Sequence, residues 1–320
     1  MSRIVTVIAG PTAVGKTKYA IEVAKAFDGE IVSCDSMQLY KYMDIGSAKP
    51  TKEELSQVKH HLVDVIDPAK AFSVASYQKL AKEAIESIFS QNKNPIVSGG
   101  TGLYVNSLLY DMDFSNTSQN LDLRKSLEEE HERFGPEFLH KKLEALDPEA
   151  ALRIHPNNVK KIIRAIEGAY SGGKIKDFKS CTEKCKDYEV NLIILTRNRE
   201  ELYDRINKRV DTLVALGLFE EVQSLLDRGL SEGDISMKGI GYKEIIGHLN
   251  GQYGKEDAIE LIKKNTRHFA KRQITWFKRY EDAKWFDISN YPDEDIAIEE
   301  MLKWLKKRYE FTTKVTNQTT

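Results

Sequence analysis

Hydrophobic and polar positions follow two alternating patterns over roughly the first third of the chain. Short apolar runs rich in β-branched residues predict buried strands, and they cover residues 4–9, 30–34, 61–66 and 95–98. Apolar residues at helical spacing predict the intervening helices, which cover residues 17–27, 74 to about 89 after Ser73 as N-cap, and 102–109. Repeated strand–helix units predict a mostly parallel sheet with helices on both faces.

The pattern changes near residue 114. A polar linker at 116–120 is followed by four helical patterns, over 121–132, 136–146, 148–154 and 158–170, and Ser171-Gly172-Gly173 ends the last of them. A strand pattern then returns at 190–196. Residues 114–188 are therefore predicted to form an all-helical insertion domain in an α/β core made of residues 1–113 and 189–311.

The rest of the chain is mostly helical by pattern. The predicted helices cover 199–228, 242–249, 255 to about 280 and 294–309, with a loop at 287–292. Residues 312–320 are polar, and we expect a frayed tail there.

A phosphate-binding motif lies between the first strand and the first helix. Gly10-Pro11-Thr12-Ala13-Val14-Gly15-Lys16-Thr17 matches G-x-x-x-x-G-K-[ST] at every position. Strand, glycine loop and helix turn backbone N–H groups and a helix N-terminus toward an anion, so a chance match is disfavoured. Lys16 is expected to reach the terminal phosphates and the Thr17 hydroxyl to ligate Mg²⁺. The motif predicts a P-loop NTPase-like core that binds two or more phosphates, and it leaves the reaction open.

Asp35 ends the second predicted strand, at the sheet edge where ligands bind in open α/β folds. Its carboxylate has two candidate roles, holding Mg²⁺ through water or acting as a general base for an acceptor group. A simple turn or capping role is the third possibility. Ser36, Met37 and Gln38 follow in the same short loop.

A second glycine turn, Gly99-Gly100-Thr101-Gly102, closes the strand at 95–98. Its N–H groups and the Thr101 hydroxyl are suited to contact a phosphate or a nucleic-acid backbone. Consecutive glycines serve tight packing equally well, so both interpretations stay open.

Basic residues gather locally, although the formal net charge of the 320-residue chain is −1 and offers no general attraction for nucleic acid. The stretch 263–279 has aromatic residues, no acid and seven basic residues: Lys263, Lys264, Arg267, Lys271, Arg272, Lys278 and Arg279. A smaller patch comprises Lys160, Lys161 and Arg164, shortly after Asn158, and the loop 239–243 adds Lys243. We interpret these patches as phosphate-backbone contacts rather than solvated faces alone.

Composition bounds the protein class. The chain is 41% hydrophobic and 30% charged, with no apolar stretch long enough to span a bilayer and no signal peptide. Its three cysteines argue against a disulfide framework, and Cys181 and Cys185 are interpreted as reduced surface thiols rather than half of a metal site. We expect a cytoplasmic protein with no membrane partner.

Taken together, the motifs resemble those of the bacterial tRNA dimethylallyltransferases (tRNA isopentenyltransferases). The resemblance spans nearly the whole chain, because the family motifs occur in order at 10–17, 35–40, 44–50, 60–64, 99–104, 154–158, 239–244 and 270–277. The order of so many motifs makes the resemblance specific, which the phosphate loop alone would not be.

The resemblance implies transfer of the dimethylallyl group of dimethylallyl diphosphate to the exocyclic amine of adenine 37, just 3′ of the tRNA anticodon, with Mg²⁺. It implies that residues 10–17 hold the diphosphate leaving group and that Asp35 acts as base on a flipped-out adenine. Thr101, Lys16 and Arg209 complete the implied catalytic set. The implied contacts to the anticodon stem-loop are Asp35, Ser36, Met37, Gln38, Thr101, Arg124, Asn158, Lys160, Lys161, Arg164, Lys243, Lys271 and Arg272.

Some positions depart from the family pattern. Ser47 replaces a frequent threonine, a mild change, and Lys160-Lys161 and Gly168 replace the usual Gln-Arg and Val of the insertion helix. Three alternatives stay open: an adenylate isopentenyltransferase acting on free nucleotide, a P-loop small-molecule kinase, and a non-catalytic module that binds nucleotide and RNA. We expect the chain to act as a monomer.

Overall fold

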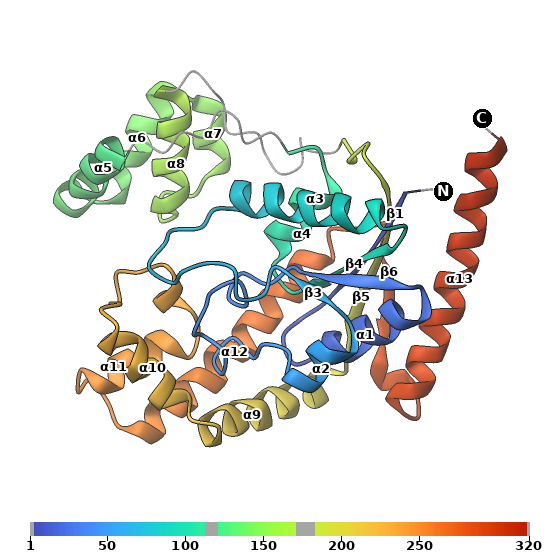
Figure 1. Ribbon diagram of the computed structural model, residues 1–320. Coiled ribbons are helices and arrows are strands. Elements are labelled where there is room, and N and C mark those ends of the chain that lie inside the picture. The colour runs from blue at the N-terminus through green and yellow to red at the C-terminus, as the bar shows by residue number, and fades with distance from the viewer. Residues whose placement is uncertain (1–2, 113–120, 171–182, 319–320) are drawn as a thin grey trace. The chain divides into compact units, whose positions relative to one another are not determined.

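The computed structural model describes residues 3–112, 121–170 and 183–318 (Figure 1). The chain forms two compact units, one of residues 1–109 and 185–320 and the other of residues 110–184. The second unit thus begins at Tyr110 and ends at Lys184, whereas the sequence predicted an insertion over 114–188. The predicted linker at 116–120, the helix end at Ser171-Gly172-Gly173 and Cys181 lie outside the described residues.

A six-stranded sheet forms the centre of the first unit, with the strand order β3-β2-β4-β1-β5-β6. Every neighbouring pair of these strands is parallel. The strands are β1 (Ile4–Ala9), β2 (Gly29–Ser33), β3 (His60–His61), β4 (Asn94–Gly99), β5 (Glu189–Thr196) and β6 (Lys284–Asp287). The predicted P-loop NTPase-like α/β fold with a mostly parallel sheet is confirmed.

Helices cover both faces of this sheet. Ile8, Ile31 and Ile96 point toward one core, which also contains the buried sides of α1 (Lys16–Ala26) and α13 (Glu294–Gln318). On the other face, α3 (Val74–Ser90) and α4 (Gly102–Leu109) pack against each other, and α3 also contacts β2 and β4. Strands that are apolar along their whole length have apolar side chains on both faces, so helices must cover both faces of the sheet.

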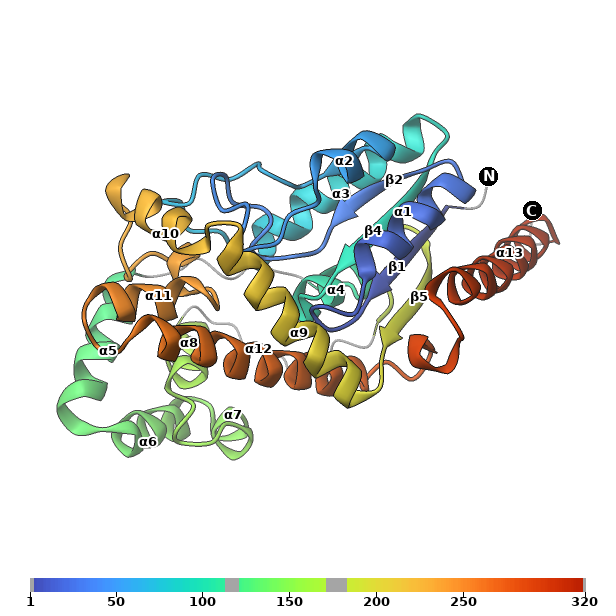
Figure 2. The same ribbon diagram turned by 90° about the horizontal axis from the view of Figure 1, so that it is seen from below.

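The remaining helices of this unit follow β5 or precede β3. They are α2 (Lys52–Gln57), α9 (Arg199–Ala215), α10 (Leu218–Asp227), α11 (Tyr242–Leu249) and α12 (Lys255–Phe277), with the short 3₁₀ turns η2 (Ser236–Lys238) and η3 (Ile288–Asn290). Helices α9 and α12 lie side by side, as Figure 2 shows. Among the described residues, no helix combines the length and the apolar character needed to cross a membrane.

Two strands differ from the sequence prediction. Of the predicted run 61–66, only His61 lies in a strand, the two-residue β3, because Leu62 and Asp64 adopt positive φ angles of 62° and 59° that end the extended conformation. Strand β6 was missed, since its four residues include two charged ones and carry too little pattern to predict a strand. It covers the free side of β5 and begins three residues before the predicted loop at 287–292.

Two helical predictions are also corrected. The helix predicted over 199–228 is divided into α9 and α10 at Gly217, whose φ of 102° favours glycine. Helix α13 continues through Gln318, whereas the sequence predicted a frayed tail over 312–320.

The second unit contains four helices among its described residues: α5 (Leu121–Phe134), α6 (Pro136–Leu146), α7 (Pro148–Arg153) and α8 (Val159–Tyr170). They enclose a separate small core that includes Leu127, Leu139 and Ile162. The described part of this unit is helical apart from an isolated bridge between Tyr110 and Lys184, as its periodicity predicted.

Candidate active site

Three loops that the sequence singled out meet at the carboxyl edge of the sheet. They follow β1, β4 and β2, which are adjacent strands in that order. The register pairs Ala9 with Gly99 and Ser33 with Ser98, so the three strands end level with one another. Parallel pairing therefore brings together the phosphate loop, the Gly99–Gly102 turn and Asp35, far apart in the chain.

The phosphate loop is closed by its own lysine and supported by two arginines. Lys16 Nζ donates to the Pro11 carbonyl at 2.9 Å, which folds its side chain over the loop. On the other side, Arg197 Nε donates to the Val14 carbonyl and Arg205 Nε to the Ala13 carbonyl, both at 3.0 Å. Because these hydrogen bonds fix the loop carbonyls, the loop N–H groups stay oriented toward a bound anion.

Arg197 and Arg205 were not predicted as site residues. Arg197 directly follows β5, which pairs with β1, and Arg205 lies four residues before Arg209 on α9. The end of a strand beside β1 and the i, i+4 spacing to a candidate arginine were signals available in the sequence.

Lys16, Asp35 and Arg209 interact electrostatically as one cluster. Surrounding protein atoms lower the pKa of Lys16 to about 8, against attraction by Asp35, and Arg209 adds to the lowering. Burial likewise lowers the pKa of Arg209, while Asp35 opposes that effect. Two cations held close together with one carboxylate create an excess of positive charge that a diphosphate would neutralise.

We expect diphosphate binding to take up a proton at Lys16 near pH 8. Without ligand the amine is half protonated at about pH 8, and a bound polyanion favours the ammonium form, so its pKa rises. Calorimetry with inorganic pyrophosphate in two buffers of different ionisation enthalpy should show extra proton uptake by the wild type relative to Lys16→Met. The difference should vanish below about pH 6, where Lys16 is already charged. Equal uptake by both proteins at pH 8 would contradict this assignment.

The Asp35 carboxylate is oriented by its own loop. Oδ1 accepts the N–H groups of Met37 at 2.8 Å and Gln38 at 3.4 Å. These hydrogen bonds fix the carboxylate plane and, within the described chain, leave Oδ2 available for a ligand. Asp35 thus caps its own turn and also lies in the charge cluster with Lys16 and Arg209. The capping role therefore does not exclude a catalytic one.

Thr101 joins the second glycine turn to the Asp35 loop. Its Oγ1 accepts the Ser36 N–H at 3.0 Å, and its own N–H donates to the Cys34 carbonyl at 3.2 Å. The glycines around it allow close packing: a Cβ at Gly99 would lie 2.0 Å from the Cys34 oxygen, and one at Gly102 would lie 2.3 Å from the Trp276 ring. The turn therefore serves tight packing, and in doing so it places Thr101 beside Asp35.

Gln38 and Met37, in the same loop as Asp35, are held by neighbouring segments of the chain. The Gln38 amide donates to the Ala48 carbonyl at 3.2 Å and accepts from the Ser33 hydroxyl at 3.1 Å. Met37 packs against Gly239, where a Cβ would come within 2.7 Å of its terminal methyl. The loop 239–243, which the sequence analysis noted for Lys243, thus also provides a surface for Met37.

Glu221 on α10 anchors the segment that supports Gln38, and sequence patterns gave no sign of it. Its carboxylate accepts three successive backbone N–H groups, from Asp44 (2.7 Å), Ile45 (2.6 Å) and Gly46 (2.9 Å). The Tyr242 hydroxyl donates a fourth hydrogen bond at 2.8 Å. An acceptor-only group is required here because all four partners donate.

Replacing Glu221 with glutamine should destabilise the protein. The amide NH₂ would face N–H donors, and at least two donors would lose their acceptor, at least one of them partly buried, which costs roughly 1–3 kcal/mol. Urea unfolding should show this loss, whereas Glu220→Gln, an exposed neighbour on the same helix, should change stability by less than about 0.5 kcal/mol. Equal stabilities of the two variants would show that the carboxylate is not an anchor.

The candidate RNA contacts of the helical unit have two different environments. Asn158, Lys160, Lys161 and Arg164 are exposed at and after the start of α8. Arg124 instead forms a bidentate pair with the buried Glu167, with N–O distances of 3.2 and 2.6 Å. Its guanidinium already serves the packing of α5 on α8, which weakens the predicted RNA contact.

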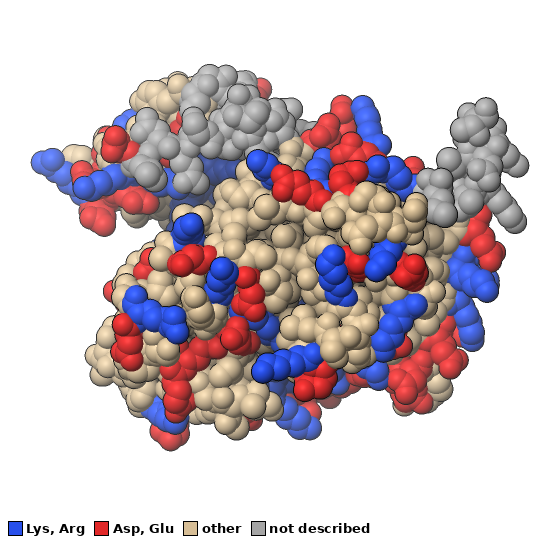
Figure 3. All heavy atoms as spheres, viewed as in Figure 1, with Lys and Arg blue, Asp and Glu red and all other residues tan. Residues whose placement is uncertain are grey.

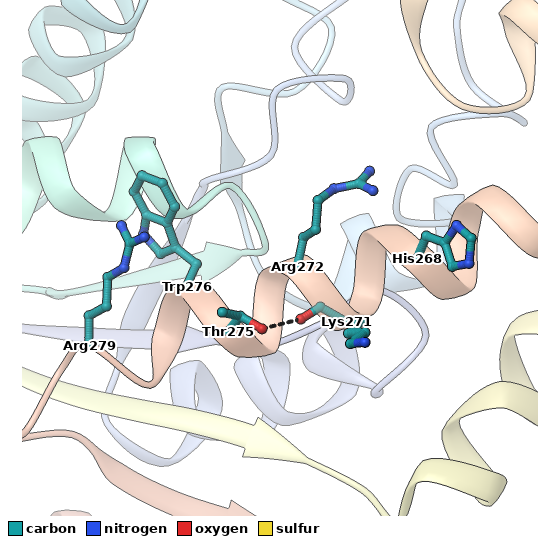
Figure 4. A pocket seen from close by; sticks show the side chains of 6 residues that line it. All are labelled: His268, Lys271, Arg272, Thr275, Trp276 and Arg279. Carbon is teal, nitrogen blue, oxygen red and sulfur yellow. Dashed lines mark hydrogen bonds between the residues drawn. The ribbon is translucent and has the colours of Figure 1, made fainter. Parts of the chain in front are cut away.

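A basic pocket lies along α12, in the stretch predicted to contact phosphates. Its six lining residues, shown in Figure 4, are His268, Lys271, Arg272, Thr275, Trp276 and Arg279. The Arg279 guanidinium lies over the Trp276 ring, 4.6 Å from its centroid. Lys271 and Arg272 are exposed. Lys243, on α11, is half-exposed, and its Nζ lies 3.5 Å from Glu244 Oε1. Elsewhere, charges of both signs are interspersed over the face seen in Figure 3.

The donor set suits a magnesium ion that is bound mainly through a ligand's phosphates. Among the described residues, no group of three or more His, Cys, Asp or Glu side chains is arranged to hold a metal. Thr17, partly exposed at the start of α1, offers one hydroxyl next to the loop N–H groups. Mg²⁺ commonly keeps several waters and takes one or two protein oxygens together with substrate phosphates, so the residues present fit this ion.

Comparison with known proteins decides between the families that this geometry allows. The family model described as IPP transferase matches residues 38–280. The chain belongs to the IPP transferase family. Proteins named tRNA dimethylallyltransferase are 51% identical in Alkaliphilus oremlandii, over 97% of this chain and 99% of the relative, and 49% identical in Clostridioides difficile, over 94% and 96%.

Solved structures of IPP transferases have the same fold. The full-length tRNA isopentenylpyrophosphate transferase of Bacillus halodurans is 40% identical, with a TM-score of 0.75 over 99% of this chain and all of that one. A eukaryotic dimethylallyltransferase acting on tRNA is 29% identical, with a TM-score of 0.77 over 89% of this chain and 74% of that one. The family resemblance seen in the motifs is thus confirmed.

Proposed function

We propose that this IPP transferase family member moves the dimethylallyl group of dimethylallyl diphosphate to the exocyclic amine of adenine 37 in tRNA. The observation that carries the proposal is the meeting of the phosphate loop, Arg209, Asp35 and Thr101 at one sheet edge, in a chain of this family. The reaction forms a carbon–nitrogen bond, breaks the carbon–oxygen bond to the diphosphate and releases a proton and diphosphate.

The phosphate loop stabilises the leaving group. Its N–H groups, with the Lys16 ammonium and the Arg209 guanidinium, face the charge that develops on the departing diphosphate. The loop is fixed in advance by Arg197 and Arg205, so little reorganisation accompanies bond breaking. A bound Mg²⁺ at Thr17 would supply further neutralisation of the phosphate oxygens.

Asp35 and Thr101 act on the acceptor. An exocyclic adenine amine is barely acidic, so Asp35 accepts a hydrogen bond from it through Oδ2 and takes the proton as the new bond forms. Thr101 holds the Ser36 backbone beside that carboxylate. The adenine leaves the stack of the anticodon loop to reach this edge, which costs a few kcal/mol.

Labelled dimethylallyl diphosphate, Mg²⁺ and an anticodon stem-loop provide the direct test. Label should enter a stem-loop that carries adenine 3′ of the anticodon and should not enter one with guanine there. Transfer to AMP in preference to the stem-loop would identify an adenylate isopentenyltransferase instead. Tight ATP binding without transfer would favour a binding module, and phosphorylation of a small acceptor would favour a kinase.

The exposed basic residues of α8 are proposed to contact RNA phosphates. Lys160→Gln together with Lys161→Gln should weaken stem-loop binding and lower the slope of log affinity against log salt by about 1 to 2, because each phosphate contact contributes roughly 0.7 to 0.9. Lys306→Gln together with Lys307→Gln, an exposed pair on α13, should leave the slope unchanged. An unchanged slope in the α8 variant would remove these residues from the interface.

We further propose that the chain acts as a cytoplasmic monomer. Every residue of the phosphate loop, the Asp35 loop and the Thr101 turn comes from one chain and one compact unit. No second copy is needed to complete this set of groups.

A further inference from the structure

One buried side chain lies between the two halves of the proposed reaction site. Gln273 on α12 is 6% exposed. Its Oε1 accepts the Thr12 N–H at 2.9 Å, and its Nε2 donates to the Gly100 carbonyl at 2.8 Å. The partners fix the orientation of the amide, because one can only donate and the other can only accept.

Gly100, in the glycine turn, leaves the space that the Gln273 amide occupies. A Cβ at Gly100 would lie 2.3 Å from Gln273 Nε2, so a larger residue would displace the amide from the carbonyl. Gly100 directly precedes Thr101, whose hydroxyl accepts the Ser36 N–H beside Asp35. Thr12 belongs to the loop that would hold the diphosphate. A single amide therefore connects the leaving-group loop to the acceptor loop.

Among the described residues, no other hydrogen bond joins these two loops beyond the strand pairing. The β1–β4 register ends at Ala9 and Gly99. Lys16 Nζ and the Nε atoms of Arg197 and Arg205 bond carbonyls of the phosphate loop itself, and the other partners of the two arginines are Glu201 and Glu294. Transfer requires the adenine nitrogen and the allylic carbon to be aligned at near-contact distance, and a misplacement of about 1 Å can lower a rate by roughly 100-fold.

We propose that Gln273 is a positioning residue that sets the distance between the diphosphate loop and the Asp35–Thr101 pair. The proposal rests on the proposed prenyl transfer. Gln273 touches neither reacting group; it acts through the Thr12 and Gly100 backbones. It should therefore affect the chemical step more than the binding of either substrate.

Three variants test this role. Gln273→Met keeps the volume and removes both hydrogen bonds, and kcat should fall by about 100-fold while KM for dimethylallyl diphosphate and the Kd for magnesium pyrophosphate change by less than about threefold. Gln273→Glu retains the acceptor toward Thr12 but donates to Gly100 only when protonated. Its kcat, relative to wild type at each pH, should recover as the pH falls from 8 to 6. Thr266→Val, which removes a hydroxyl bonded to the Ile262 carbonyl on the same helix, should retain wild-type kcat.

A purely structural role predicts other results. Gln273→Met would then lower the melting temperature with kcat unchanged, and the pH profile of Gln273→Glu would parallel that of wild type. Either result overturns the inference. Hydrogen exchange of the Thr12 amide, which needs no activity, should accelerate at least tenfold in Gln273→Met; an unchanged rate also overturns it. Absence of label transfer by the wild type would instead refute the proposed function.

Discussion

Replacing Asp35 with asparagine is expected to slow prenyl transfer by about 100- to 10,000-fold, the range that a general base contributes. Asparagine keeps the shape of the side chain and can still accept the Met37 N–H through its oxygen, which Asp35 Oδ1 accepts at 2.8 Å. It cannot take a proton from the adenine amine, and its NH₂ would meet that amine at the Oδ2 position. Single-turnover assays with labelled dimethylallyl diphosphate and saturating stem-loop measure the chemical step.

Binding of the leaving group separates the two roles considered for Asp35. If the carboxylate serves as base, magnesium pyrophosphate should bind Asp35→Asn within about threefold of wild type, or slightly more tightly, because a negative charge near Lys16 and Arg209 is gone. Parallel losses of rate and pyrophosphate affinity would assign the carboxylate to the metal instead. Asp204→Asn, exposed on α9, is the matched control and should behave as wild type.

The sequence predicted the elements that carry strong periodicity. The phosphate loop, the strand before it and the helix after it need only local information, and the parallel sheet follows from repeated strand–helix units. Adjacency of Asp35, Thr101 and the phosphate loop required the strand order, since β4 lies between β1 and β2 although it follows both in the chain. For that step the family resemblance supplied what pattern alone did not.

The sequence did not predict the residues that act through contacts with distant backbone atoms. Glu221 and Gln273 each bond backbone atoms more than 170 positions away, and nothing in their local pattern distinguishes them from surface residues of an amphipathic helix. Arg124 is a different case, because a basic residue predicted to contact RNA also forms a pair with Glu167 inside its own unit. Charge patches predict a kind of partner, and only packing shows which charges are already used.

Gly99→Ala is expected to lower the rate of transfer by at least about 100-fold although Gly99 has no chemical group. The added Cβ would lie 2.0 Å from the Cys34 oxygen, 2.2 Å from its carbonyl carbon and 2.7 Å from its Cα. These are backbone atoms held by the Cys34 N–H bond to the Ser98 carbonyl at 2.7 Å, so no flexible side chain can move aside. To reach ordinary contact, the Cys34–Asp35 segment must shift by about 1 Å, enough to misplace the base.

This prediction is specific because the added Cβ disturbs the Cys34–Asp35 segment and not the phosphate loop. The phosphate loop follows β1 and is closed by Lys16 and two arginines, so Gly99→Ala should still bind magnesium pyrophosphate within a few-fold of wild type and give a native circular dichroism spectrum. Gly254→Ala is the matched control, because its Cβ would meet only Asp257 Oδ2 at 3.4 Å. A Gly99→Ala enzyme that folds, binds pyrophosphate and transfers the prenyl group at the wild-type rate would show that the position of Asp35 is not set by this contact. The close approach of β4 to Cys34 would then have no part in orienting the base.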